Sequence, residues 1–168
     1  MILSNALRIL VLMLALSVFQ SVHADAGPVS VVSGTPIESH FQYWEDTGAN
    51  ATLAEVRALP ESAWQHRPTG KATFGITDSA YWLRVELHNQ TDRDQLLIAE
   101  LAYSQLDDVV FHELSGGTLL REFRTGDTRP FYPRDVDHPS MLFRFQVAPD
   151  NLKTLYIRVA TQGTMVMP

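Results

Sequence analysis

Apolar and polar residues alternate along most of the chain after Gly70, which is the period expected of strands with one buried face. Six segments follow this pattern, and we expect strands over residues 81–88, 95–101, 107–114, 119–123, 141–147 and 154–160. Turn residues separate nearly all of them, and the pair Gly116-Gly117 favours a tight hairpin. Short strands at such regular spacing predict an all-β fold, an antiparallel sandwich of two packed sheets.

A short helix is expected just before these strands. Thr52 and Glu55 have the spacing of a capping box, and a proline follows a few residues later. Leu53, Val56 and Leu59 recur at helical intervals, so they define one apolar face. We expect about two turns of helix that cover one end of the core.

The strand over residues 81–88 places different chemistry on its two faces. One face is apolar and is expected to point into the core: Tyr81, Leu83, Val85 and Leu87. The other face carries an indole, a guanidinium, a carboxylate and an imidazole: Trp82, Arg84, Glu86 and His88. This second face has the groups to stack on and hydrogen-bond a polar ligand, and an ordinary solvated face is the alternative.

The last two predicted strands alternate in the same way. Their apolar positions are expected in the core: Phe143, Phe145, Val147, Leu155, Ile157 and Val159. Their other positions are expected at the surface: Arg144, Gln146, Tyr156 and Arg158. Two sheets packed face to face would bury the first set and expose the second.

The first 24 residues have the order of a secretory signal peptide. Arg8 precedes an apolar stretch over residues 9–19, and small residues precede the predicted cut after Ala24. The apolar stretch is about half as long as a membrane-spanning helix needs to be. We expect cleavage, with a retained anchor as the alternative, and a single mature domain over residues 25–168.

Composition narrows the classes of protein and partner. The chain has no cysteine, which excludes disulfides, thiolate catalysis and cysteine-based zinc sites. It has 13 basic and 19 acidic side chains, a net charge of −6, and no basic run. Nucleic acid and anionic lipid headgroups are therefore not expected as partners. Export without disulfides fits the bacterial periplasm.

Four stretches of the chain stand out for their order and spacing. They are residues 74–84 (Phe-Gly-Ile-Thr-Asp-Ser-Ala-Tyr-Trp-Leu-Arg), 106–109 (Leu-Asp-Asp-Val), 125–131 (Thr-Gly-Asp, then Arg-Pro-Phe) and 155–159 (Leu-Tyr-Ile-Arg-Val). In this order they resemble the type 2 extracellular sensor domain of bacterial seven-transmembrane receptors with diverse intracellular signalling modules (7TMR-DISM). The resemblance covers residues 43–168, nearly the whole mature chain.

This resemblance implies a periplasmic jelly-roll β-sandwich similar to carbohydrate-binding modules. It also implies that seven membrane helices and a cytoplasmic output, such as a histidine kinase or a diguanylate cyclase, follow in the intact protein. The chain stops at Pro168, within a further predicted strand that includes Thr164. We therefore expect it to be a fragment of a longer inner-membrane receptor.

Ligand-binding side chains are expected on one sheet face and in the loop beside it: Trp82, Arg84, Arg129, Tyr132, Arg134, Tyr156 and Arg158. An aromatic ring can cover the apolar side of a sugar, while planar donors and acceptors bind its hydroxyls. Alternatively, Arg129 and Arg134 can clamp a carboxylate in bidentate fashion. The expected partner is thus a small polar ligand, either a carbohydrate or a carboxylate.

Asp135 and Asp137 lie in this loop, over residues 129–138, and Asp127 lies just before it. Carboxylates two residues apart can share a calcium ion, so Asp135 and Asp137 are a candidate pair, although the loop lacks the glycine and distal glutamate of an EF-hand. The alternative is a solvated turn, with these carboxylates paired to the arginines and Trp82 packed under a loop. No cofactor is expected.

Catalysis finds little support in the sequence. The chain contains no Gly-x-Ser-x-Gly, no His-Glu-x-x-His and no phosphate-binding glycine loop. Paired carboxylates for glycoside hydrolysis stay open as an alternative. Strand alternation places Glu86, Glu100 and Glu113 at the surface, however, so we expect a binding domain and not an enzyme.

Three hypotheses about function follow. The first is a periplasmic sensor that binds a small polar ligand and transmits its occupancy to membrane helices. The second is a protein-interaction module, such as a homodimer, that controls receptor assembly through an exposed sheet face or edge. The third is a secreted carbohydrate-binding domain. A concave polar face favours the first hypothesis, and a flatter apolar patch favours the second.

Overall fold

The computed structural model describes residues 27–31, 40–66, 72–130 and 134–167. The predicted signal peptide and the candidate residue Tyr132 lie outside these ranges. The elements are β1 (Val29–Ser30), β2 (Gln42–Asp46), α2 (Leu53–Arg57), the 3-10 turn η2 (Glu61–Ala63), β3 (Gln65–His66), β4 (Ala72–Ile76), β5 (Ala80–His88), β6 (Gln95–Leu101), β7 (Asp108–Ser115), β8 (Thr118–Thr125), β9 (Met141–Val147), β10 (Leu152–Ala160) and β11 (Thr164–Met167). The described fold is therefore mostly β, with one short α-helix, as the sequence predicts.

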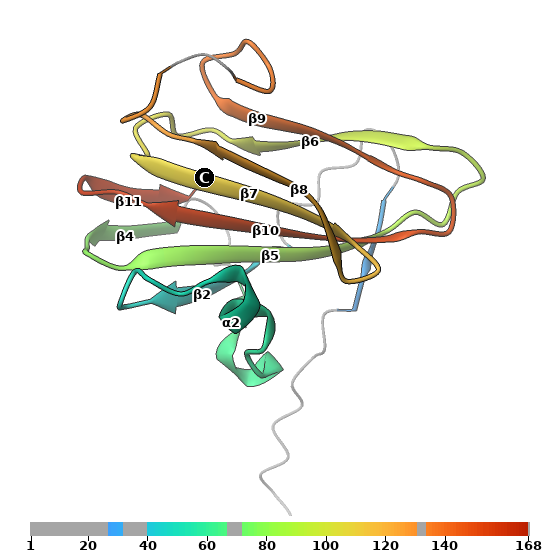
Figure 1. Cartoon of the computed structure of the whole chain (residues 1–168), viewed down its shortest axis with the longest axis horizontal. Coiled ribbons are helices and arrows are strands. Elements are labelled where there is room, and N and C mark those ends of the chain that lie inside the picture. Colours follow the sequence, from blue (N-terminus) through green and yellow to red (C-terminus); the bar gives the residue numbers. More distant parts are fainter. Residues whose placement is uncertain (1–26, 32–39, 67–71, 131–133, 168) are drawn as a thin grey trace, which may run out of the picture.

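A large sheet dominates the molecule, with the strand order β3-β2-β5-β10-β7-β8 (Figure 1). Neighbouring strands in this order are antiparallel, and β1 adds a short parallel pairing to β5. All six predicted strands are present, and the bounds of β6 and β9 match the prediction at both ends. Gly116 and Gly117 form the predicted hairpin between β7 and β8, with φ angles of 53° and 79° that suit glycine in a tight turn.

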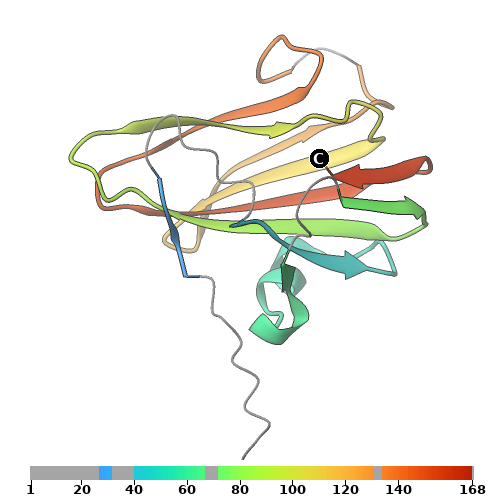
Figure 2. The same cartoon turned by 180° about the vertical axis from the view of Figure 1, so that it is seen from behind.

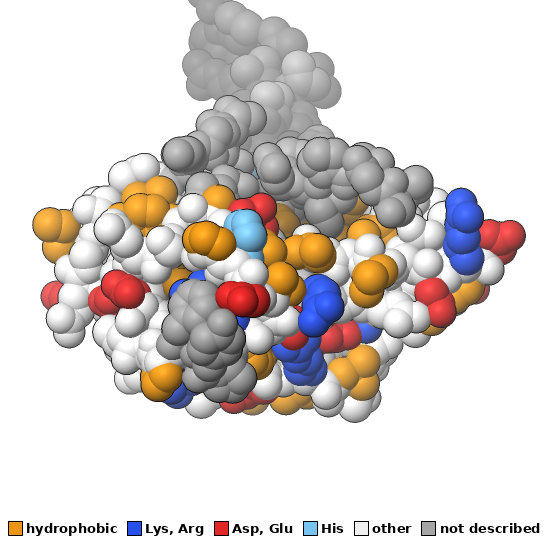
Figure 3. All heavy atoms as spheres, turned by 90° about the horizontal axis from the view of Figure 1, so that it is seen from above, with side chains coloured by type: hydrophobic (Ala, Val, Ile, Leu, Met, Phe, Trp, Pro, Cys, Tyr) orange, Lys and Arg blue, Asp and Glu red, His pale blue; other side chains and the backbone are white. Residues whose placement is uncertain are grey.

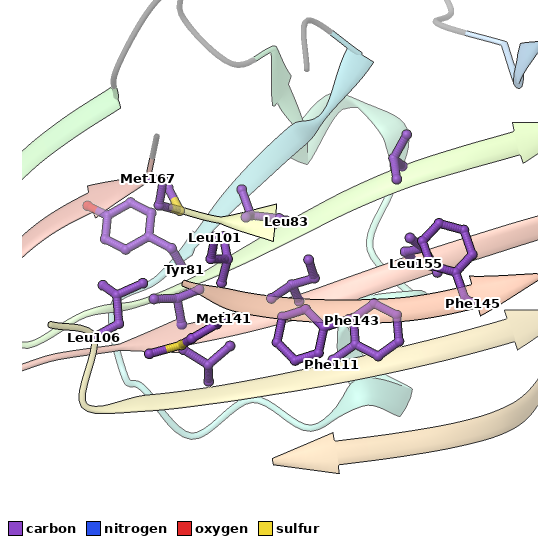
Figure 4. Close-up of a cluster of buried hydrophobic side chains, with 14 of the residues drawn as sticks. Tyr81, Leu83, Leu101, Leu106, Phe111, Met141, Phe143, Phe145, Leu155 and Met167 are labelled. Atoms are coloured by element: carbon purple, nitrogen blue, oxygen red, sulfur yellow. The ribbon is translucent and has the colours of Figure 1, made fainter. Parts of the chain in front are cut away.

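Two smaller strand pairs, β6–β9 and β4–β11, lie against one face of the large sheet (Figure 2). The main core fills the space between the layers, and Figure 4 shows its central residues. Phe111 of β7 stacks on Phe143 of β9, with ring centroids 4.7 Å apart. The apolar faces predicted for β5, β9 and β10 all belong to this core, because strand alternation directs them inward.

The opposite face of the large sheet is covered by residues 47–64, which include α2 and η2; we call them the covering segment. Thr52 and Glu55 form the predicted capping box at the start of α2. Val56 is 1% exposed and packs with Trp64 into a second apolar cluster on this face. The helix therefore covers a sheet face rather than an end of the core, which corrects the sequence-based expectation.

Two further expectations about surface residues are wrong. Glu113 is buried, because its side chain forms an ion pair with the buried Lys153 of the neighbouring strand. Tyr156 is buried because it belongs to the second cluster. Strand alternation placed Tyr156 on its face correctly, but it could not show that this face is covered. Glu113 lies on the same face of β7 as Phe111, the inner face, so the surface position expected for it was also wrong in its choice of face.

Candidate functional site

Trp82 lies beneath the covering segment and not on an open face. It is 1% exposed, and its indole stacks on the imidazole of His112 with ring centroids 5.6 Å apart. Tyr156 is 7% exposed, and its ring centroid lies 6.1 Å from that of Trp64. The predicted exposure of Trp82 and Tyr156 is therefore wrong. The covering segment occupies the place where a sugar ring would stack on them.

Arg84 is the next side chain after Trp82 on the same face of β5, and partners from two other elements hold it. Its Nη1 and Nη2 atoms donate to the two carboxylate oxygens of Glu61 at 2.8 and 2.5 Å. Its Nε and Nη2 atoms donate to Oε1 of Gln42 on β2 at 3.1 and 2.5 Å. The guanidinium carbon also lies 4.4 Å from the ring centroid of Trp64, a cation–π contact. The guanidinium is thus fixed in one orientation.

The pair of Arg84 and Glu61 is charged at neutral pH. Burial disfavours the charged guanidinium, but Glu61 outweighs this effect and raises the pKa of Arg84. The hydrogen bonds from Arg84 in turn lower the pKa of Glu61. Because the Arg84 side chain is only 9% exposed while that of Glu61 is 65% exposed, the carboxylate is the member of the pair that solvent reaches.

A small polar pocket opens beside this pair, with a volume of about 90 Å³. Its polar lining includes residues from three elements and one residue before β2. These are Gln42 of β2, Glu61 of η2, Arg84 and Glu86 of β5, and His40. The lining thus contains one guanidinium and two carboxylates, a net charge of −1 with the imidazole neutral. Hydrogen-bond donors and acceptors from separate elements converge here, which is typical of a ligand site.

Arg129 and Arg158 meet at a different place, around Asp108 at the start of β7. Nη1 of Arg158 donates to Oδ2 of Asp108 at 3.1 Å, and Nε of Arg129 donates to Oδ1 at 3.4 Å. Arg124 of β8 binds both oxygens, at 2.8 and 2.7 Å. Burial alone would raise the pKa of Asp108, but hydrogen bonds and charge from these arginines outweigh it and lower the pKa.

Arg134 and Asp135, in the loop before β9, have partners of their own. Nη1 of Arg134 donates to the backbone oxygens of His138 and Pro139 at 2.9 and 3.0 Å. Asp135 forms an ion pair with Arg121 and accepts the backbone N–H of Arg144 at 2.6 Å. These contacts fix the loop against β8 and β9, so Arg134 and Arg129 do not form a joint clamp.

Metal binding at Asp135 and Asp137 stays a prediction. Among the residues that the structure describes, no three His, Cys, Asp or Glu side chains are grouped so as to hold a metal ion. The Asp135 carboxylate is also engaged by a guanidinium and a backbone amide, which are donors that a calcium ion would have to replace.

The sequence did not reveal Gln42, Glu61 or Asp108 as site residues. Glu61 is 23 positions from Arg84 along the chain and reaches it only because η2 folds over the sheet. Asp108 appeared only within the predicted strand over residues 107–114 and within the stretch 106–109. A signal was present for it, because three of the four stretches singled out above contain Asp108, Arg129 and Arg158, which the fold brings together.

A comparison with family models matches residues 38–168 to the 7TMR-DISM extracellular 2 family. The chain belongs to this family. It is therefore an extracellular sensor domain of 7TMR-DISM receptors, which confirms the resemblance seen in the sequence. A comparison with curated proteins finds no match. No helix within the described ranges of this 7TMR-DISM domain is long and apolar enough to cross a bilayer.

Proposed function

We propose that this 7TMR-DISM extracellular 2 domain binds a neutral, hydroxyl-rich ligand, such as the end of a carbohydrate, in the pocket beside Arg84. The observation that carries the proposal is the convergence of a fixed guanidinium, an amide and two carboxylates on one small hollow. Sugar hydroxyls both donate and accept, so they can satisfy all of these groups at once.

The charge of the pocket favours a neutral ligand over a carboxylate. Arg84 already has Glu61 as its counterion, and Glu86 adds a second carboxylate to the lining. A ligand carboxylate would therefore meet repulsion from both glutamates with no uncompensated cation to bind. A hydroxyl group would instead accept from the guanidinium or donate to Glu86 without adding charge.

The size of the pocket limits what it can enclose. A volume of about 90 Å³ is well below the roughly 300–1,000 Å³ of pockets that enclose a whole small-molecule ligand. The pocket therefore holds one end of a ligand, and the rest of the molecule lies outside it. Binding through a ligand end suits a terminal sugar unit better than a fully enclosed metabolite.

For signalling, the ligand must bind one receptor state more tightly than the other, because equal affinity for both shifts nothing. We place the domain in the periplasm, as a jelly roll similar to carbohydrate-binding modules, before seven membrane helices and a histidine kinase or diguanylate cyclase. The family and the antiparallel layers support this arrangement. The covering segment, fixed by Glu61 at the pocket, is the element through which occupancy would act.

The test is a thermal-shift and NMR titration of the chain with a panel of neutral sugars, polyols and carboxylates. We expect saturable binding for a member of the neutral set, with shifts at Gln42, Arg84 and Glu86. Glu86→Gln should weaken that binding about tenfold, because a hydrogen bond to a charged acceptor is lost. Glu100→Gln, an equal change on an exposed residue of β6, should not. Binding of carboxylates alone at this pocket would refute the proposal.

Association of two copies is a second candidate function, favoured by one observation on β6. Leu96 and Ile98 are 66% and 56% exposed on this strand, which pairs within the described ranges only with β9. Figure 3 looks onto this side of the molecule and shows hydrophobic side chains in small groups between charged ones. A dimer that Ile98→Ser dissociates in light-scattering measurements would support this function, and a monomer at all concentrations would exclude it.

A further inference from the structure

We propose that the arginine cluster around Asp108 is a second binding site, and that it takes a small oxyanion such as a carboxylate or a sulfate. The cluster consists of Asp108, Arg124, Arg129 and Arg158. It lies apart from the residues that line the Arg84 pocket and prefers the opposite charge. It is therefore independent of the proposed carbohydrate site.

The first support is the ratio of guanidiniums to carboxylates at the centre of the cluster. Three guanidiniums share the single carboxylate of Asp108. Two further carboxylates lie close by: Glu122 lies 3.4 Å from the imidazole of His112, and Asp107 accepts the N–H of Gln162 and the hydroxyl of Thr161. Their partners are neutral at pH 7, so these carboxylates offset the positive charge of the cluster, and the case for an anion depends on the donors of the guanidiniums.

The second support is the number of unused donors. A guanidinium has five N–H groups, and the fork geometry suits oxyanions. Among contacts between described residues, Nη1 of Arg124 and both Nη atoms of Arg129 make no hydrogen bond. Both side chains are accessible, at 50% and 42% exposed. An arriving anion can bind these donors without displacing Asp108.

The third support is that the site is organised in advance. Arg158 is fixed at two points, since its Nη2 atom donates to the backbone oxygen of Ala49 at 2.8 Å. The turn that carries Arg129 is held against β7, because Asp127 N–H donates to Leu106 O at 2.8 Å and Thr128 Oγ1 to Asp107 O at 2.7 Å. Prior ordering lowers the entropy that binding must overcome.

The experiment is an NMR and calorimetric titration of the chain with sodium sulfate and, separately, malonate, in a dilute chloride buffer. We expect saturable binding of both probes, with shifts at Asp108, Arg124 and Arg129. Arg129→Gln should weaken binding at least tenfold, and Arg124→Gln is a second variant in case the first fails to fold. Arg93→Gln, the same charge change at an exposed turn, should leave the affinity within twofold.

Each other outcome counts against the proposal. Shifts that do not saturate, or an equal loss in Arg93→Gln, would mean that the anions only screen charge. Saturable binding of sulfate without malonate would restrict the site to tetrahedral anions and overturn the carboxylate class. Glu86→Gln should leave anion binding unchanged, so a failure here is distinguishable from a failure of the carbohydrate proposal.

Discussion

Nη2 of Arg84 lies 2.5 Å from Oε2 of Glu61, and this pair joins the 3-10 turn η2 to the central strand β5. The pair sits at one end of the covering segment, and the hydrogen bond from Arg158 to Ala49 sits at the other. Between these two points lie the apolar contacts of α2 with Trp82 and Tyr156. The covering segment is thus held by a guanidinium near each end and by an apolar cluster in the middle.

Glu61→Gln should lower the free energy of unfolding by about 1–2 kcal/mol, because it leaves the buried guanidinium of Arg84 with only a neutral acceptor, Gln42. Urea denaturation of the chain measures this loss. Glu100→Gln is the matched control, since Glu100 is exposed on β6 and should change stability by less than about 0.5 kcal/mol. Equal effects of the two variants would show that the ion pair contributes nothing.

The buried pair of Lys153 and Glu113 makes a second prediction. Both residues are less than 10% exposed, so removing one leaves an uncompensated buried charge. Lys153→Met should destabilise by about 3–5 kcal/mol. The double variant Lys153→Met/Glu113→Leu should recover at least half of that loss, because no charge then remains buried. A double variant as unstable as the single one in urea denaturation would contradict this account.

His112 predicts a dependence of stability on pH. Burial lowers the pKa of its imidazole below the ordinary value of 6.5, although Glu122 opposes this shift. Below pH 6.5 the unfolded chain therefore binds a proton before the folded chain does. The free energy of unfolding should fall as the pH drops from about 7 toward 5, and the loss stops only below the folded pKa.

His112→Gln tests this assignment because glutamine does not titrate in this range. The variant should have a shallower pH dependence of stability between pH 5 and 7 than the parent chain, whatever its stability at pH 7. Denaturation midpoints at four or five pH values measure the slope. An unchanged slope would assign the titration to another residue.

Gly126 is required at the turn after β8. Its φ is +142°, and a Cβ added there would lie 2.1 Å from the backbone oxygen of Asp107. Gly126→Ala should therefore destabilise by about 2–4 kcal/mol and displace Arg129 from Asp108. Gly163→Ala is the control, because its nearest neighbour would be 3.5 Å away. Thermal melts and the anion titration measure the two effects, and equal melting temperatures would refute the steric argument.

The strands, the helix cap and the hairpin could be predicted from the amino-acid sequence alone. These features depend on neighbours in the chain: the two-residue period of strands, the spacing of Thr52 and Glu55, and the pair Gly116-Gly117. The residues of the main core that lie on β5, β9 and β10 could be predicted in the same way, because apolar side chains on alternate positions of a strand all point to the side that is shielded from water. The four stretches that resemble the family could also be recognised from the sequence, because each is a continuous run of residues.

What covers the other face of the large sheet could not be predicted from the sequence and became clear only in the folded chain. Alternation placed Trp82 and Tyr156 on that face correctly, but it carries no information about a segment that packs there from elsewhere in the chain. The partners of Arg84 and Arg158 are likewise distant in sequence, at Glu61 and Asp108. Long-range contacts of this kind depend on strand order and loop path, which local periodicity does not specify.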